Sequence, residues 1–295
     1  MSAFDYRAPE TLAEALALLG EYGEQARVIA GGTALVTMMR QRLVRPACVV
    51  SLRDVPGLDR IEATNGALHL GALVTHREVE LSPLVRERLP VLAETFRHVA
   101  TVRIRNMATV GGALAHADPN QDPPVTLLAL GAEVEIRGAG GRRTVPIGEF
   151  FRNYYETVLE PGELVTGVTA PLLPSGSGAV YVKFLPRTAD DYATVSVAAT
   201  LTLEPDGERC REARIALGSV GVTPVRGQAA EALLHGQRLS AELLSAAGEA
   251  AKGEVDPLSD HRGSAAYKRD MAGVMVRRAL RQAWEAAGRS ARGAR

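Results

Sequence analysis

Cysteine is scarce in this chain of 295 residues, which contains only Cys48 and Cys210. An iron–sulfur or metal–thiolate cluster needs about four ligands, usually at close spacing. These two cysteines lie far apart in the sequence and form no CxxC motif. The chain therefore cannot hold an iron–sulfur cluster by itself.

Net charge and long apolar runs are also missing. The 34 Lys and Arg residues balance 34 Asp and Glu residues, so no long-range positive field attracts a phosphate backbone. No apolar segment approaches the roughly 18 residues of a membrane span, and residues 1–10 lack the pattern of a secretory signal. These absences predict a soluble cytoplasmic protein with no transmembrane segment and no nucleic-acid partner.

The common catalytic motifs are absent as well. There is no GxSxG, no HExxH and no His/Cys metal-ligand spacing, and neither GxGxxG nor GxxxxGK[ST] occurs, which argues against a Rossmann site and a P-loop. Asp118 and Asp122 share a loop with three prolines, where an aspartate more often caps a turn than acts in catalysis. His116, in the same segment, is a candidate ligand contact or a loop-stabilising hydrogen-bond partner.

The length suggests two domains or three small ones, and hydrophobic periodicity predicts helices mixed with strands, with an α+β pattern in the C-terminal unit. The first fifty residues are predicted to form a small α/β unit, which opens with a helix capped by Thr11 and ended by Gly20. Short strands mixed with helices follow. Residues 171–178 are the best linker candidate, and beyond them strands precede helices. The last helix is predicted at 264–287. The arginine-rich stretch 277–295 is interpreted as a solvated helix face followed by a frayed tail, with a binding patch as the alternative.

Two glycine turns, Gly31-Gly32 and Gly111-Gly112, each follow β-branched residues. Each is predicted to leave a strand and to expose several backbone N–H groups, an arrangement that favours phosphate oxygens. Either turn alone could be an ordinary tight turn. Two of them fit a diphosphate held between two loops better than a monophosphate, so the residues predict a nucleotide-type ligand.

The sequence around both turns closely resembles the two FAD loops of one family. The segments are 30–35 (AGGTAL) and 109–119 (TVGGALAHADP), followed by Asp122. The family is the FAD-binding medium subunit of molybdenum hydroxylases, which includes aerobic carbon monoxide dehydrogenase and the xanthine dehydrogenase group. Similar signatures continue in the expected order over about residues 4–285: Phe4-Asp5-Tyr6, then 160–164 (EPGEL), 191–194 (DYAT) and 267–279 (YKRDMAGVMVRRA).

The resemblance implies an α+β chain with a vanillyl-alcohol oxidase-type FAD-binding fold of two α/β lobes. A C-terminal domain of a small antiparallel sheet and a helical bundle would follow. The expected boundaries are 1–57 for FAD-binding lobe 1, 58–175 for lobe 2, 176–285 for the C-terminal domain and 286–295 for the tail.

The resemblance also implies a site for non-covalently bound FAD. Its pyrophosphate loops map onto Ala30, Gly31, Gly32, Thr33 and Ala34 and onto Thr109, Val110, Gly111, Gly112 and Ala113. By the same mapping Asp122 lies near the ribityl or ribose hydroxyls, Val165 is a backbone or apolar contact, Lys183 is a flavin-side contact and Tyr192 lies beside the isoalloxazine ring. No residue of this chain is expected to be catalytic or to bind a metal.

Two positions depart from the family pattern. Ala34 stands where a polar residue is frequent, and Ala113 stands where asparagine is common, so the side-chain hydrogen bonds of those residues are missing here. The backbone of both turns is expected to be unaffected. Lys183 to Tyr192 is also one residue longer than in a carbon monoxide dehydrogenase relative.

The implied function is electron transfer within a complex. A large subunit would carry the molybdenum cofactor, a small subunit would carry two [2Fe–2S] clusters, and this subunit's FAD would pass electrons to an external acceptor. The assembly is expected to be a dimer of heterotrimers, with the substrate chosen in the molybdenum subunit. The alternatives are a self-sufficient FAD oxidoreductase of the same fold and a non-catalytic assembly protein that retains the fold.

Overall fold

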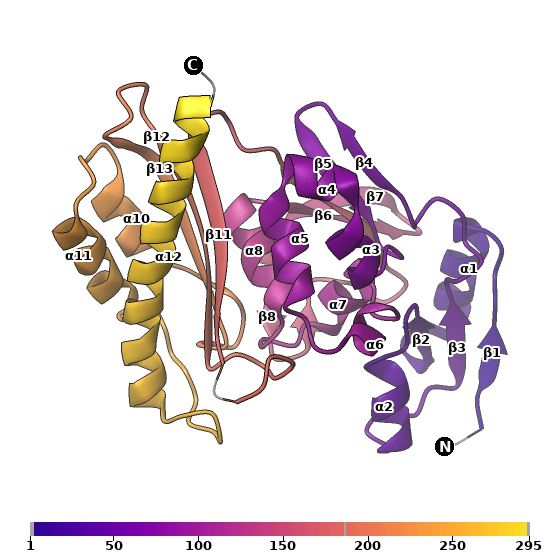
Figure 1. The fold of residues 1–295 in the computed structure, drawn as a ribbon. Helices are drawn as coiled ribbons and strands as arrows, with labels where there is room; N and C mark the ends of the chain where they lie inside the picture. The colour runs from indigo at the N-terminus through magenta and orange to yellow at the C-terminus, as the bar shows by residue number, and fades with distance from the viewer. Residues whose placement is uncertain (1–2, 186, 294–295) are drawn as a thin grey trace.

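The computed structural model describes residues 3–185 and 187–293 and has an α+β architecture of three main sheets with helices packed on them (Figure 1). The central lobe lies between the N-terminal lobe and the C-terminal domain. Within the described residues, no helix combines the length and the apolar character needed to cross a membrane.

The N-terminal lobe contains a parallel sheet with strand order β1-β3-β2. Its strands are β1 (Asp5–Arg7), β2 (Ala26–Ile29) and β3 (Cys48–Ser51), and its helices are α1 (Leu12–Tyr22), the 3-10 helix η1 (Gly23–Gln25) and α2 (Leu35–Arg40). Because β2 and β3 are parallel, the loop that leaves β2 lies at the carboxyl edge of the sheet, a usual place for ligands.

Helix α1 begins as predicted but ends later. The Thr11 hydroxyl accepts the backbone N–H of Glu14 at 3.1 Å. The helix then continues through Gly20, so the predicted end there is wrong. Gly23 ends it instead, with φ +51, a conformation that a residue without Cβ adopts readily.

The central lobe is built on an antiparallel sheet with strand order β4-β5-β10-β6-β7, covered by helices α3 to α8 on the side seen in Figure 1. Its strands are β4 (Ile61–Thr64), β5 (Ala67–Gly71), β6 (Glu133–Gly138), β7 (Gly141–Pro146) and β10 (Leu164–Pro171), with a separate hairpin of β8 (Phe151–Asn153) and β9 (Glu156–Thr157). Its helices are α3 (His76–Leu81), α4 (Pro83–Arg88), α5 (Pro90–Arg97), α6 (Val102–Arg105), α7 (Val110–His116), α8 (Asp122–Leu130) and α9 (Ile147–Phe150).

The C-terminal domain has an antiparallel sheet in the order β11-β12-β13-β14, with the long helix α12 lying across it (Figure 1). The strands are β11 (Ser177–Phe184), β12 (Val195–Leu203), β13 (Cys210–Gly218) and β14 (Val225–Arg226), and the helices are α10 (Gln228–Leu234), α11 (Ala241–Ala251) and α12 (Ala265–Gly293). Helix α12 extends well past residue 287, so most of the predicted tail is helical.

Helix α8 joins the central lobe to the C-terminal domain. All nine of its residues are buried, and it packs against α5 on one side and against β12 and β13 on the other. The predicted boundaries at 57 and 175 fall in the connections between the three sheets and stay predictions. The junction around α8 includes Asp122, the first residue of the helix, and Lys183 of β11.

Candidate functional site

The first glycine loop, Ala30–Ala34, connects β2 to α2 and is half-exposed along its whole length. Within the described part of the chain, the backbone N–H groups of residues 31–34 donate to no protein acceptor. Gly32 has φ +73, the left-handed conformation that turns successive N–H groups toward one side. The loop therefore offers the row of free amides that the sequence predicts.

The second glycine turn differs from that prediction. It does not follow a strand, because Thr109 caps helix α7 and the turn forms the first residues of that helix. All four of its amides are used inside the protein: Val110 donates to Val74 O (2.9 Å), Gly111 to Ala72 O (2.9 Å), Gly112 to Thr109 Oγ1 (3.2 Å) and Ala113 to Thr109 O (2.9 Å). The predicted second row of free amides is wrong, since this turn uses its hydrogen bonds to begin a helix.

The two turns nevertheless lie together. A Cβ added to Gly31 would stand 1.6 Å from the carbonyl oxygen of Met107, just before the second turn. A Cβ added to Gly112 would stand 3.9 Å from the Cβ of Ala30. The segments that carry both turns are also neighbours in Figure 1, where α2 approaches α6 and α7. The second turn thus forms a wall beside the free amides of the first.

Asp122 and Lys183 lie against each other rather than at an open surface. Lys183 Nζ donates to Asp122 Oδ2 at 2.8 Å and to the carbonyl oxygen of His98 at 2.9 Å. The Tyr181 hydroxyl donates to the other carboxylate oxygen, Oδ1. The Lys183 side chain is only 2% exposed and the Asp122 side chain only 5%. Burial raises the pKa of Asp122, and the neighbouring Lys183 ammonium opposes that rise.

This pairing does not support the ligand contacts expected for Asp122 and Lys183. Asp122 is the first residue of α8 and Lys183 belongs to β11, so the ion pair joins the central lobe to the C-terminal domain. A buried ion pair with additional hydrogen bonds fixes the relative position of the elements that carry it. In this structure the pair ties α8 to β11.

Val165 is also part of the interior. It lies in β10 opposite Ile136 of β6, next to a break in the register of the two strands, and its side chain belongs to the core of the central lobe. The expected apolar contact of Val165 is therefore with the protein itself in this structure.

Tyr192 reaches across the junction between the C-terminal domain and the central lobe. Its hydroxyl donates to Asp118 Oδ2 at 2.9 Å, while 43% of the residue remains exposed. Burial and the Asp118 carboxylate raise its pKa well above the ordinary value, so the phenol stays protonated. The ring of Tyr155 also lies nearby and packs on His116 with ring centroids 5.1 Å apart.

His116 packs on Tyr155 at the end of helix α7. Partial burial lowers its pKa, although Asp118 opposes the change, so the imidazole is neutral at physiological pH. Together His116, Asp118, Tyr155 and Tyr192 form a polar and aromatic cluster beyond the end of helix α7, which begins at the second glycine turn.

Sequence reasoning missed three exposed apolar side chains in the segment that precedes the second turn. Val102, Ile104 and Met107 are 47%, 38% and 50% exposed, and Met107 provides the backbone against which Gly31 packs. Their exposure leaves apolar surface on the segment that leads into the second turn. The sequence signal is weak, because the segment reads as a short amphipathic helix.

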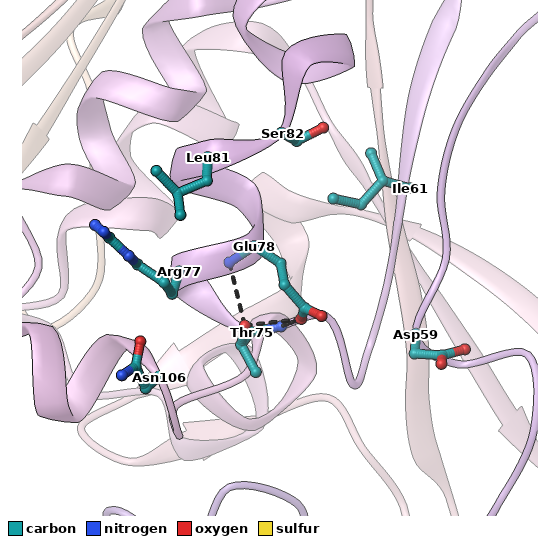
Figure 2. A pocket seen from close by; sticks show the side chains of 8 residues that line it. All are labelled: Asp59, Ile61, Thr75, Arg77, Glu78, Leu81, Ser82 and Asn106. Carbon is teal, nitrogen blue, oxygen red and sulfur yellow. Dashed lines mark hydrogen bonds between the residues drawn. The ribbon is translucent and has the colours of Figure 1, made fainter.

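A cavity of about 580 Å³ opens between α3 and β4, and Thr75 and Asn106 are among the residues that line it (Figure 2). Its lining includes two acids, Asp59 and Glu78, with one base, Arg77. Glu78 is already held by the backbone N–H and hydroxyl of Thr75, each at 2.7 Å, as a helix capping box. This cavity therefore lacks the features of an anion site, and the glycine turns remain the candidate.

Two family models together match nearly the whole chain. The model described as the FAD binding domain in molybdopterin dehydrogenase matches residues 2–173, and the model described as the CO dehydrogenase flavoprotein C-terminal domain matches residues 180–283.

The curated relatives agree over almost their full length. The carbon monoxide dehydrogenase medium chain of Afipia carboxidovorans is 39% identical, covering 95% of this chain and 96% of that protein. The medium chain of the same name from Hydrogenophaga pseudoflava is 37% identical, with coverages of 95% and 97%. The nicotine 6-hydroxylase medium subunit of Paenarthrobacter nicotinovorans is 36% identical, with coverages of 96% and 98%.

Solved structures match equally well. A carbon monoxide dehydrogenase structure from Hydrogenophaga pseudoflava superimposes with a TM-score of 0.93 at 38% identity, covering 96% of this chain and 98% of that one. A quinoline 2-oxidoreductase structure from Pseudomonas putida 86 gives 0.91 at 35% identity, with coverages of 97% and 99%. The chain belongs to the family of FAD-binding medium subunits of molybdopterin dehydrogenases. It is therefore an oxidoreductase subunit with an FAD-binding domain, as the motifs predict.

Proposed function

We propose that this chain is the FAD-carrying electron-transfer subunit of a heterotrimeric molybdenum hydroxylase. The observation that carries the proposal is the row of unpaired amides at Gly31–Ala34, which lies against the wall formed by the second turn. A negatively charged diphosphate is the part of FAD that such a row of N–H groups stabilises. Bulky side chains are excluded at the contact, because a Cβ on Gly31 would overlap Met107.

Each part of the site then has a task. The amides of residues 31–34 hold the diphosphate oxygens, and the turn from Thr109 to Ala113 limits the cleft on its other side. Ile104 and Met107 offer apolar surface to a planar ring, and Tyr192 lies beside the isoalloxazine ring. The bound FAD supplies the redox chemistry, accepting electrons from a partner and passing them to an external acceptor. The chain's residues bind and orient it.

Asp122, Val165 and Lys183 are assigned to the frame rather than to direct contact. The Asp122–Lys183 pair fixes β11 against α8, and the strand β11 leads into the loop that carries Tyr192. Their contribution to cofactor binding is thus indirect: the ion pair holds the C-terminal domain at the distance that Tyr192 needs to reach Asp118, and Val165 packs in the core of the central lobe.

The electron donor belongs to a partner. Cys48 and Cys210 are both buried and free, and they lie in different domains, so neither joins a thiolate cluster in the described chain. The relatives are named as medium chains or subunits, which implies larger and smaller partners. We assign the molybdenum cofactor to the large subunit and the [2Fe–2S] clusters to the small one, in a cytoplasmic dimer of heterotrimers.

Purification of the tagged chain from its own host tests this assignment. We expect two further chains to copurify, with molybdenum and iron in the preparation and a flavin spectrum that bleaches when substrate is added. A chain that purifies alone and whose flavin is reduced directly by substrate would instead identify a self-sufficient oxidoreductase. Copurifying partners without any bound flavin would identify an assembly protein.

A further inference from the structure

A tight turn just before helix α12 carries an arginine to the domain junction. The backbone groups of Asp260 and Gly263 exchange hydrogen bonds of 3.0 and 3.1 Å, which closes the turn around Arg262. Lys268 of α12 also holds the turn. Its Nζ forms an ion pair with Asp260 Oδ2 at 2.8 Å and donates to the carbonyl oxygen of Leu258 at 3.0 Å. Arg262 therefore projects from a rigid base.

Arg262 holds the segment around Tyr192 in three ways. Its Nη2 donates to Asp191 Oδ1 at 2.9 Å, and its carbonyl oxygen accepts the Thr194 hydroxyl at 3.3 Å. Its guanidinium carbon lies 5.4 Å from the centroid of the Tyr192 ring, within the range of a cation–π contact. Arg262 therefore contacts Tyr192 itself and a residue on each side of it in the sequence.

The guanidinium is held both by Asp191 and by the ring of Tyr192, in an orientation that leaves one of its donors unpaired. The Arg262 side chain is only 13% exposed, and its Nε is buried without a hydrogen-bond partner among the described residues. An unpaired buried donor costs free energy, so a geometry that leaves one is retained for some other interaction. Stacking on Tyr192 is the interaction that this orientation provides.

The opposite end of Tyr192 is held by the other domain. Its hydroxyl donates to Asp118, which belongs to the central lobe, whereas Arg262 belongs to the C-terminal domain. Asp118 in turn accepts the backbone N–H of Asn120 at 2.9 Å, which fixes the carboxylate. The ring is thus fixed between a cation on one domain and an anion on the other.

We infer that Arg262 is the positioning residue for Tyr192, holding its ring in the place from which it contacts the flavin. The inference rests on the proposed function, in which Tyr192 lies beside the isoalloxazine ring. A planar guanidinium suits this task because it can stack on a ring while donating to a carboxylate, which a lysine ammonium cannot do in the same geometry.

Fluorescence of the bound flavin tests the inference, because a tyrosine ring in contact with a flavin quenches its emission. The FAD-reconstituted chain is compared with Arg262→Gln, Tyr192→Leu and the double variant. We expect Arg262→Gln to increase the emission of bound FAD toward that of Tyr192→Leu. It should also weaken FAD binding about three- to tenfold, the scale of a partly desolvated cation–π contact.

The double variant separates positioning from general damage. In the Tyr192→Leu background, Arg262→Gln should add no further change in emission, because the ring to be positioned is gone. Asp191→Asn weakens the anchor of Arg262 and should shift emission in the same direction with less risk to folding. Arg238→Gln is the matched control: it removes another arginine of the same domain that pairs with one acid, Glu208, at the surface.

The outcomes distinguish this inference from the proposed function. A folded wild-type chain that binds no FAD contradicts the proposed function itself. If FAD binds but Tyr192→Leu leaves its emission unchanged, Tyr192 is not beside the flavin and the inference is overturned alone. Wild-type emission and affinity in Arg262→Gln and Asp191→Asn, with unchanged circular dichroism, would also overturn it.

Discussion

Gly31→Ala perturbs the contact between the two glycine turns most directly. The added Cβ would lie 1.6 Å from the Met107 carbonyl oxygen and 2.6 Å from its carbonyl carbon. A carbon and an oxygen approach to about 3.3 Å in ordinary contact, so the two backbones must separate by roughly 1.7 Å. Neither backbone can rotate away as a flexible side chain would.

The cost follows from the amides that this shift displaces. A hydrogen bond weakens steeply once its length exceeds its usual range by about 1 Å. Each of the four amides at residues 31–34 contributes about 0.5–1.5 kcal/mol when it holds an oxygen. Losing most of them costs about 2–4 kcal/mol, which raises the dissociation constant of FAD about 30- to 1000-fold.

Titration of the apo chain with FAD measures the effect, with circular dichroism to verify folding. Gly20→Ala is the matched control, because a Cβ at this position in helix α1 meets no atom within 4 Å. We expect that control to bind FAD normally and to be more stable by up to about 1 kcal/mol. A folded Gly31→Ala chain with wild-type affinity would refute the reasoning.

Three further substitutions test the frame. His76 is buried with both ring nitrogens unpaired, and burial lowers its pKa to about 4 from 6.5. The unfolded chain therefore binds more protons between these pH values, and stability falls as pH falls through that window. In His76→Phe the loss of unfolding free energy between pH 7 and pH 4 should be about 3 kcal/mol smaller than in the wild type. Gly178→Ala should cost about 1–3 kcal/mol in urea unfolding, because its Cβ would lie 2.1 Å from a backbone oxygen of α12, while Gly253→Ala, whose nearest neighbour is at 3.5 Å, should be nearly neutral. Asp122→Ala leaves the buried Lys183 ammonium without its carboxylate partner and should lower the free energy of unfolding by about 3–5 kcal/mol. A loss below about 1 kcal/mol would contradict the buried pair.

Local signals in the sequence predicted the elements well where one pattern dominated. The alternating segments of the C-terminal domain form β11, β12 and β13, and the Thr11 cap begins α1 as expected. The end of α1 was misjudged because glycine is tolerated within a helix. Only the positive φ of Gly23, a property of the folded backbone, identifies the stop.

The candidate site was less predictable because it depends on contacts between distant segments. Both glycine pairs look alike in sequence, but Thr109 begins a helix and its neighbours donate to Ala72 and Val74, which only the tertiary structure brings close. Asp122 and Lys183 are 61 positions apart, and no periodicity signals that they pair. Arg262 was missed for the same reason.

Release of cofactor from the purified native chain tests the central claim most directly. The chain is isolated from its host, denatured in acid or by heat, and separated from small molecules, and the flavin in each fraction is quantified. We predict about one FAD per chain, all of it in the small-molecule fraction, because the site holds FAD through hydrogen bonds from backbone amides and not through a covalent bond. Flavin that stays attached to the denatured chain, or a folded native chain that releases none, would contradict it.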